Sequence, residues 1–102
     1  MPTVYITAPP EAADSLAETL VEERLVACVN QFDIHSTYRW EGEIHRDNEV
    51  ALLAKTTAER YDDVETRVRE LHPYDVPCIE RFDEDALLPA FAQWCNDATT
   101  DD

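Results

Sequence analysis

The chain of 102 residues is poor in glycine and in recognisable catalytic motifs. Its single glycine, Gly42, excludes the GxGxxG and GxxxxGK loops that bind phosphate groups. Neither HExxH nor GxSxG occurs, and the three histidines are scattered along the chain, so a catalytic triad has little support. We therefore expect no enzymatic activity.

Basic residues are also scarce. Lys and Arg together number 8 against 23 Asp and Glu, and the formal net charge is −15. A chain this acidic repels nucleic acid and anionic lipid, so neither is expected as a partner. The carboxylates are spread over every segment, which favours a surface adapted to high salt, and hence a halophilic origin. An acidic surface that binds cations or a basic protein is the alternative.

The three cysteines, Cys28, Cys78 and Cys95, are odd in number and form no CxxC pair. They exclude a disulfide framework and a four-cysteine zinc site, and they suit a reducing cytosol. The opening MPTVYITAPP has no basic n-region or apolar h-region, so we expect no signal peptide. No apolar run approaches the ~18 residues of a membrane span. We expect one soluble, cytoplasmic domain over residues 1–102.

Apolar periodicity predicts strands and helices in a regular order. The predicted strands cover residues 3–7, 25–40, 43–56 and 76–82. The predicted helices cover residues 11–24, 57–71 and 83–97. Thr56 and Glu59 have the spacing of a capping box for the second helix. The order βαββαβ plus a C-terminal helix predicts an α+β, ferredoxin-like fold.

The same periodicity predicts which side chains face inward on each helix. The inward positions expected in the helices are Ala12, Leu16, Leu20, Tyr61, Val64, Val68, Leu71, Leu87, Leu88, Phe91, Trp94 and Cys95. On the strand over residues 25–40, the apolar side chains fall at even positions and share one face: Val26, Cys28, Phe32, Ile34, Tyr38 and Trp40.

The two central strands form an unusually long hairpin. If residues 41–42 are its loop, Trp40 lies opposite Glu43 and Tyr38 opposite His45. Arms of about 14–16 residues span about 50 Å, whereas a domain of this size is about 35 Å across. The tip carries Tyr38, Trp40 and Ile44, which are poorly suited to contact with water. We therefore expect the tip to pack against a neighbouring copy in a homo-oligomer.

The stretch LHPYDVPCIE, residues 71–80, holds the strongest candidate ligands. A neutral His72 could bind a soft or borderline metal ion, with Cys78 or Glu80 as a second ligand. The simpler alternative is a histidine that caps the carbonyl groups at a helix C-terminus. Tyr74, between two prolines, is explained most simply as part of a rigid corner, and otherwise as a phenol that lines a cleft between subunits.

Other candidates have weaker patterns. Lys55, one of few basic residues, could bind an anion or pair with a nearby acid. His35 and His45 on the hairpin could form a surface copper site, but solvent-facing strand positions explain them more simply. Cys28 and Cys95 fall on apolar faces and are expected in the core.

The segments ERLVACVN, STYRWEGEI, EVALLAKT and LHPYDVP, in this order, resemble the CutA family of divalent-cation tolerance proteins. The resemblance covers residues 3 to about 82. It implies a homotrimer of ferredoxin-like subunits joined by their long hairpins, similar in architecture to the P-II signalling proteins. It also implies binding of copper or another divalent cation, with no established reaction. The resemblance makes His72 a metal contact, and it assigns a cleft between subunits to Lys55, Tyr74, Trp40 and Tyr38.

Two departures from the family pattern concern the metal. Cys78 stands after the VP proline, where the family often has glutamate, and Glu80 follows two positions later. A thiol shifts the preference toward Cu(I) or another soft ion. Ile6 occupies the place near the first strand where some members have a cysteine. Our hypothesis is a non-enzymatic metal-binding trimer with His72, Cys78 and Glu80 as ligands; the alternative is a P-II-like sensor that binds a small molecule in the cleft.

Overall fold

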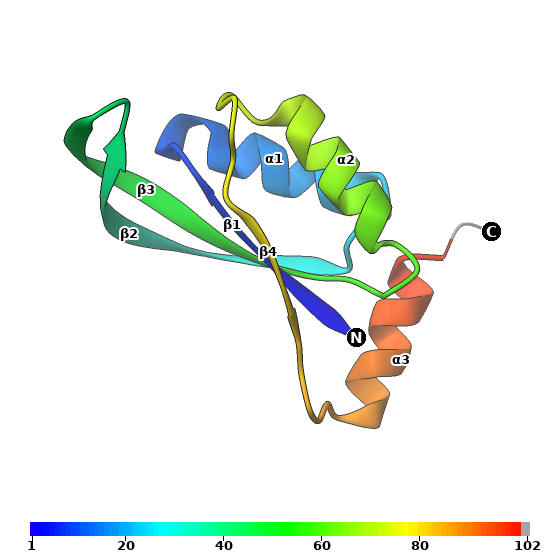
Figure 1. Cartoon of the computed structure of the whole chain (residues 1–102). Coiled ribbons are helices and arrows are strands. Elements are labelled where there is room, and N and C mark those ends of the chain that lie inside the picture. Colours follow the sequence, from blue (N-terminus) through cyan, green and yellow to red (C-terminus); the bar gives the residue numbers. More distant parts are fainter. Residues whose placement is uncertain (101–102) are drawn as a thin grey trace.

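A computed structural model describes residues 1–100, which form one antiparallel sheet and three helices (Figure 1). The strands are β1 (Pro2–Ala8), β2 (Cys28–Trp40), β3 (Glu43–Lys55) and β4 (Ile79–Asp83). The helices are α1 (Pro10–Glu22), α2 (Tyr61–Leu71) and α3 (Pro89–Ala98). This order confirms the predicted α+β, ferredoxin-like fold. In the described part of the chain, no helix is long and apolar enough to span a membrane.

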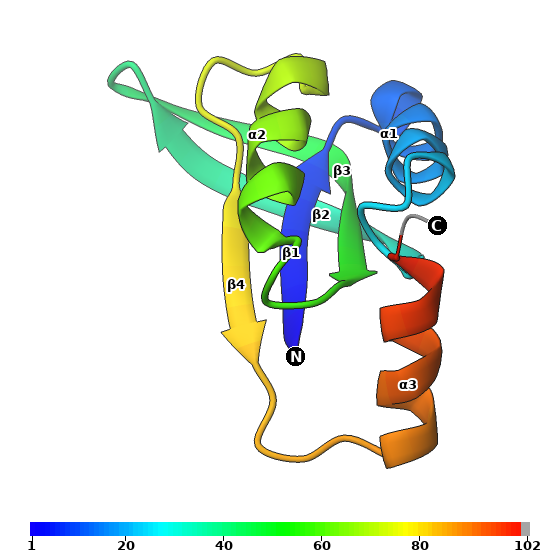
Figure 2. The same cartoon turned by 90° about the vertical axis from the view of Figure 1, so that its right-hand side faces the viewer.

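The sheet has the strand order β2-β3-β1-β4, with every neighbouring pair antiparallel. α1 and α2 lie side by side over one face of the sheet (Figure 2). α3 lies at the end of the sheet where β1 begins (Figure 1). We call the face opposite α1 and α2 the open face.

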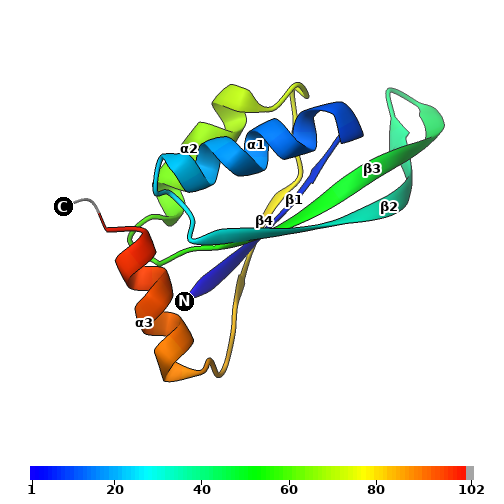
Figure 3. The same cartoon turned by 180° about the vertical axis from the view of Figure 1, so that it is seen from behind.

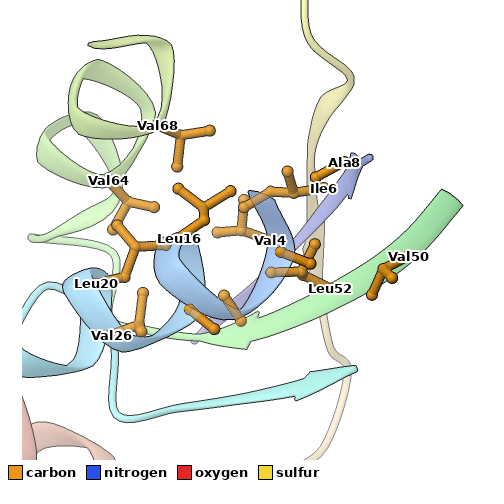
Figure 4. Packing of buried hydrophobic residues seen from close by; sticks show 13 residues of the cluster. Val4, Ile6, Ala8, Leu16, Leu20, Val26, Val50, Leu52, Val64 and Val68 are labelled. Carbon is orange, nitrogen blue, oxygen red and sulfur yellow. The ribbon is translucent and has the colours of Figure 1, made fainter. Parts of the chain in front are cut away.

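The core lies between the sheet and α1 and α2 (Figure 4). Alternate residues of β1, which are Val4, Ile6 and Ala8, point toward the helices and are fully buried. The apolar stripes of the helices meet them, with Leu16 and Leu20 among the buried residues of α1. Burying one such aliphatic side chain contributes about 1.5–3 kcal/mol, so this layer accounts for the orientation of both helices.

The hairpin has the predicted register. Trp40 pairs with Glu43 and Tyr38 with His45, so the two-residue loop is confirmed. Glu41 and Gly42 both have positive φ, 51° and 82°, as a type I′ turn requires. This turn matches the twist of the strands, which is why so long a hairpin can keep one register.

The far half of the hairpin leaves the sheet as a two-stranded ribbon. β1 stops pairing with β3 at Val50, and the cross-strand pairs from Ile34–Glu49 to Trp40–Glu43 lie beyond it. The ribbon bends (Figure 3), and the longest axis of the described chain is 45 Å. The overshoot is therefore present but shorter than the expected ~50 Å, because each strand has 13 residues and the ribbon is curved.

The register sends the two apolar sets of the hairpin to opposite faces, because cross-strand partners share a face. Val50 and Leu52 of β3 join the core under α1 and α2. Phe32 and Trp40 of β2 pair with Ala51 and Glu43 instead, and so lie on the open face. There they are 48% and 46% exposed.

The predicted capping box at Thr56 and Glu59 is wrong. α2 begins at Tyr61, four residues later than predicted, and its N-cap has no side-chain hydrogen bond. The hydroxyl of Thr56 is buried and donates to the carbonyl oxygen of Leu25 at 2.7 Å. This tertiary contact uses the group that would have capped the helix.

Several inward positions were also predicted wrongly. α3 begins at Pro89, and Leu88 and Trp94 are 70% and 48% exposed. Leu71, at the end of α2, is exposed as well. The helical periodicity assumed that each apolar stripe meets a sheet. α3 lies only against the end of the sheet, where there is little surface to pack on. Cys95 is the one residue of this helix that is buried there.

We predict that the turn conformation, and not crowding, makes Gly42 necessary. A Cβ added at Gly42 would meet no atom within 4 Å, so Gly42→Ala should cost only the backbone energy of positive φ, about 1 kcal/mol in the free energy of unfolding. Urea denaturation measures this loss. Glu41→Asn is the matched variant and should raise the free energy of unfolding, since asparagine tolerates positive φ better than glutamate. A neutral effect of Gly42→Ala would contradict the type I′ assignment.

Candidate functional site

A groove of about 600 Å³ lies on the open face, where the ribbon leaves the sheet and the segment between α2 and β4 crosses beside it. We call it the hairpin groove. Its lining residues come from β1, β2, β3 and the segment before β4: Tyr5, Thr7, Ile34, His35, Ser36, Thr37, Tyr38, Glu49, Val76 and Cys78. A smaller hollow of about 270 Å³ shares Tyr38 and Val76 with it and also contacts Trp40 and Tyr74.

His72 lies at the C-terminal end of α2 with both ring nitrogens in hydrogen bonds. Its Nε2 lies 2.8 Å from the carbonyl oxygen of Thr7 and must donate to it, since a carbonyl only accepts. Its Nδ1 accepts the backbone N–H of Tyr74 at 3.1 Å. The ring is 7% exposed and joins β1 to the corner that follows α2. A metal ion at His72 would have to displace one of these bonds, so ligation by His72 stays a prediction.

Glu49 is the functional candidate that the sequence analysis missed. It lies on β3 opposite Ile34 and is 6% exposed, although it is an acid in a very acidic chain. Its Oε2 accepts a hydrogen bond from the Tyr74 hydroxyl at 3.2 Å. Burial of the phenol, and then the negative charge of Glu49, raises the pKa of Tyr74 to about 12. An acid directly before the apolar run of a strand, as in NEVAL, is the sequence signal that could have revealed it.

A second phenol–carboxylate pair lies farther along the ribbon. The Tyr38 hydroxyl donates to Asp47, and this bond is the main reason that the pKa of Tyr38 is raised. The His45 ring stacks on Tyr38 with 5.4 Å between ring centroids, as their cross-strand pairing predicts. His35 instead bonds Asn48 through Nδ1 at 2.7 Å, so the two histidines are engaged with different partners.

Cys78 and Glu80 are in contact. The Cys78 thiol donates to Oε1 of Glu80 at 3.4 Å. Burial, and then the hydrogen bond and the negative charge of Glu80, raises the pKa of the Cys78 thiol. The thiol is therefore protonated at neutral pH, and a metal ion that binds it must displace its proton.

The structure brings together some of the predicted site residues but not all. Among residues 1–100, no three His, Cys, Asp or Glu side chains form a group that could hold a metal ion, so His72 does not complete a three-ligand site with Cys78 and Glu80. Tyr38, Trp40 and Tyr74 share the smaller hollow of the single chain, and their place in a cleft between subunits stays a prediction.

Lys55 lies away from these cleft residues in the same chain. It is six residues along β3 from Glu49, about 20 Å at the usual strand rise. Its Nζ donates to the Thr3 hydroxyl at 3.3 Å. It also lowers the otherwise raised pKa values of the Cys28 and Cys95 thiols. The Cys95 side chain is fully buried, as expected for a core residue. Cys28 is only partly buried and lies opposite Lys55 on the open face, so its predicted place in the core is wrong.

These features define a small ferredoxin-like protein with a long hairpin and an acidic, phenol-lined groove at the hairpin's base. Residues 2–98 match the family model described as "CutA1 divalent ion tolerance protein". The chain is 40% identical over 97 residues to the divalent-cation tolerance protein CutA of Pyrococcus horikoshii, covering 94% of this chain and 95% of that one. The chain therefore belongs to the CutA1 family of divalent-cation tolerance proteins.

Solved structures agree in fold over nearly the whole length. The PII-like protein CutA from Nostoc, in apo form, superposes with a TM-score of 0.95 at 34% identity, covering 98% of each chain. A protein from Archaeoglobus fulgidus described as a periplasmic divalent cation tolerance protein CutA gives a TM-score of 0.93 at 37% identity, covering 98% of this chain and all of that one. The fold is thus PII-like.

We predict that Tyr74 titrates well after an ordinary tyrosine. Its folded-state pKa of about 12 lies above the ordinary tyrosine pKa of about 10, so the unfolded chain loses this proton first as pH rises. The stabilising effect of the neutral phenol is complete below about pH 10 and is lost between about pH 10 and 12. The difference in tyrosinate absorbance between the native protein and Tyr74→Phe measures this titration. If this difference showed Tyr74 losing its proton near pH 10, the contact with Glu49 would be contradicted.

Proposed function

We propose that this chain is a non-enzymatic protein that binds a divalent metal ion, with copper as the preferred ion, and acts in metal tolerance as a homotrimer. The observation that carries the proposal is its membership, over residues 2–98, of a family described by divalent ion tolerance. The contact between Cys78 and Glu80 supports it, since a thiol and a carboxylate at 3.4 Å are two adjacent donors for an ion.

The metal site that we propose needs a third ligand besides Cys78 and Glu80. Two adjacent donors do not make a closed metal site, and structural zinc sites, for example, use four. The chain as described offers no third acidic, histidine or cysteine ligand beside Cys78 and Glu80. His72 supplies the third ligand if it gives up a hydrogen bond; otherwise the ligand comes from a neighbouring copy.

A titration with Zn(II) tests this site, because Zn(II) binds thiols without oxidising them. We expect one ion per chain in 1 M KCl with a weak chelator present, since salt and chelator suppress loose binding by surface carboxylates. Cys78→Ser and His72→Ala should each weaken binding at least tenfold. Cys28→Ser removes a thiol far from the groove and should leave binding unchanged. Equal binding by all four proteins would disprove the assignment.

The homotrimer is proposed from the open face. Phe32, Trp40 and Phe82 are all about half exposed, and the ribbon that carries Trp40 has no further strand beside it in the described chain. Apolar side chains this exposed are typical of an interaction surface. A neighbouring copy that covers the open face would bury them and also give the ribbon a partner.

We predict a trimer whose stability rises with salt. Each added chain brings a further net charge of −15, and the screening length falls from about 10 Å at 0.1 M to about 3 Å at 1 M salt, so assembly should tighten in molar KCl. Sedimentation equilibrium at both salt concentrations measures this. Phe32→Glu should give monomers, whereas Val21→Glu, which also puts glutamate in place of an exposed apolar residue but on α1, should not. A monomeric native protein at both salt concentrations would rule the proposal out.

A P-II-like sensor of a small molecule is the second candidate function. The hairpin groove favours it, because about 600 Å³ is within the usual range for small-molecule sites.

Under either function we place the protein in the cytoplasm and attribute its acidity to a high-salt environment. The cytoplasmic location is supported by the three cysteines, which form no disulfide in the described chain.

A further inference from the structure

A separate groove lies on the helix side of the sheet, between the C-terminal half of α1 and the first part of β2 (Figure 3). We call it the α1 groove. Its volume is about 330 Å³, and its lining residues are Ala17, Glu18, Val21, Glu22 and Val29. Val29 pairs with Ala54, a residue of the core, so its side chain lies on the same side of the sheet as the helices. The homotrimer proposed from the open face therefore leaves the α1 groove accessible.

The floor of the α1 groove is apolar and partly uncovered. Ala17 is buried, but Val21 is 41% exposed and Val29 is only partly buried. β2 is an edge strand, so no further strand lies beside Val29 in the described chain. Exposed apolar side chains that meet in a hollow are typical of an interaction surface. The floor has room for one or two apolar side chains of a partner.

The rim of the α1 groove carries two carboxylates without a cationic partner. Glu18 and Glu22 are exposed, lie one helical turn apart and make no ion pair within residues 1–100. Arg24, the nearest cation in sequence, donates instead to the carbonyl oxygen of Ala98 at 3.4 Å. Like charges at this spacing destabilise a helix.

The position of these carboxylates along α1 adds to the negative potential. Glu22 is the last residue of α1, and the last turn of this helix has no basic residue. The C-terminal end of a helix has a partial negative charge and favours a cation. A cation bound at the rim would relieve both the repulsion between Glu18 and Glu22 and the unfavourable interaction with the helix dipole.

We propose that the α1 groove is a docking surface for a cationic, amphipathic segment of a partner protein. Apolar side chains of the segment pack on Val21 and Val29, and its lysine or arginine side chains pair with Glu18 and Glu22. A second copy of this chain fits poorly, because its 23 acids outnumber its 8 cations. The same charge repels nucleic acid and anionic lipid. β2 and β4 are opposite edges of the sheet, so this surface is separate from the proposed metal site and goes beyond the proposed function.

Fluorescence anisotropy of labelled, amidated peptides tests the proposal, with the full-length protein in about 0.1 M KCl and EDTA. The probe has three repeats of Lys-Leu-Ala-Lys, and two control peptides replace its leucines by serine or its lysines by glutamate. We expect saturable binding of the probe, at least tenfold weaker binding of the serine peptide and no binding of the glutamate peptide. Raising KCl to 1 M should weaken binding of the probe at least tenfold, because salt screens exposed charge pairs.

Matched variants separate the α1 groove from the general acidity of the chain. Glu18→Gln combined with Glu22→Gln should weaken binding of the probe at least tenfold. Glu11→Gln combined with Glu59→Gln removes the same charge from two exposed positions outside the groove, and should change binding less than twofold.

The apolar floor has its own pair of variants. Val21→Ser should weaken binding of the probe at least fivefold, whereas Leu71→Ser, at an exposed apolar position of α2, should leave it unchanged. In the isotope-labelled protein, the amide chemical shifts that the probe changes should be concentrated at residues 17–22 and 28–30.

Any of four results would overturn the proposal. They are an equal loss of binding in the two glutamine double variants, equal binding of the serine peptide and the probe, native binding by Val21→Ser, and no saturable binding of the probe. The first of these would mean that the peptide binds only to the net charge of the chain. EDTA removes metal ions and one chain forms the groove, so none of these results would bear on the metal site or the homotrimer.

Discussion

The register of the β2–β3 hairpin is the constraint on which the rest of the structure depends. The type I′ turn at Glu41 and Gly42 pairs Trp40 with Glu43, and every later pair follows from this one. Since side chains alternate between faces along a strand, one residue of slip would move Val50 and Leu52 out of the core. The same register places the apolar residues of β2 on the open face.

The hairpin groove is a consequence of that placement. Where β1 ends, the ribbon loses its neighbour, and the corner after α2 crosses beside it. His72 joins the corner to β1 through its two hydrogen bonds, which positions Tyr74 against Glu49. His72 therefore organises the groove in the single chain, whatever else it binds. A buried acid, two further phenols and a thiol meet there, in a chain whose other acids are mostly exposed.

The sequence predicted the parts of the fold that depend on local patterns. Alternation in β1, the helical stripe of α1 and the two-residue turn each depend on neighbours in sequence, and the structure has all three. The errors fell where a tertiary contact decided the outcome. Thr56 bonds Leu25, 31 residues away, instead of capping α2, and Trp94 of α3 meets too little sheet to be buried.

By itself the sequence determined the family, the order of the elements and the hairpin register, because periodicity and turn chemistry are local. It also singled out His72, Cys78 and Tyr74 as residues of one short segment. Only the tertiary structure decided what they contact: His72 bonds Thr7, 65 residues away, and Tyr74 bonds Glu49, 25 residues away. The groove exists because separate segments meet at the base of the hairpin, and the spacing of residues within one segment carries no information about such a meeting.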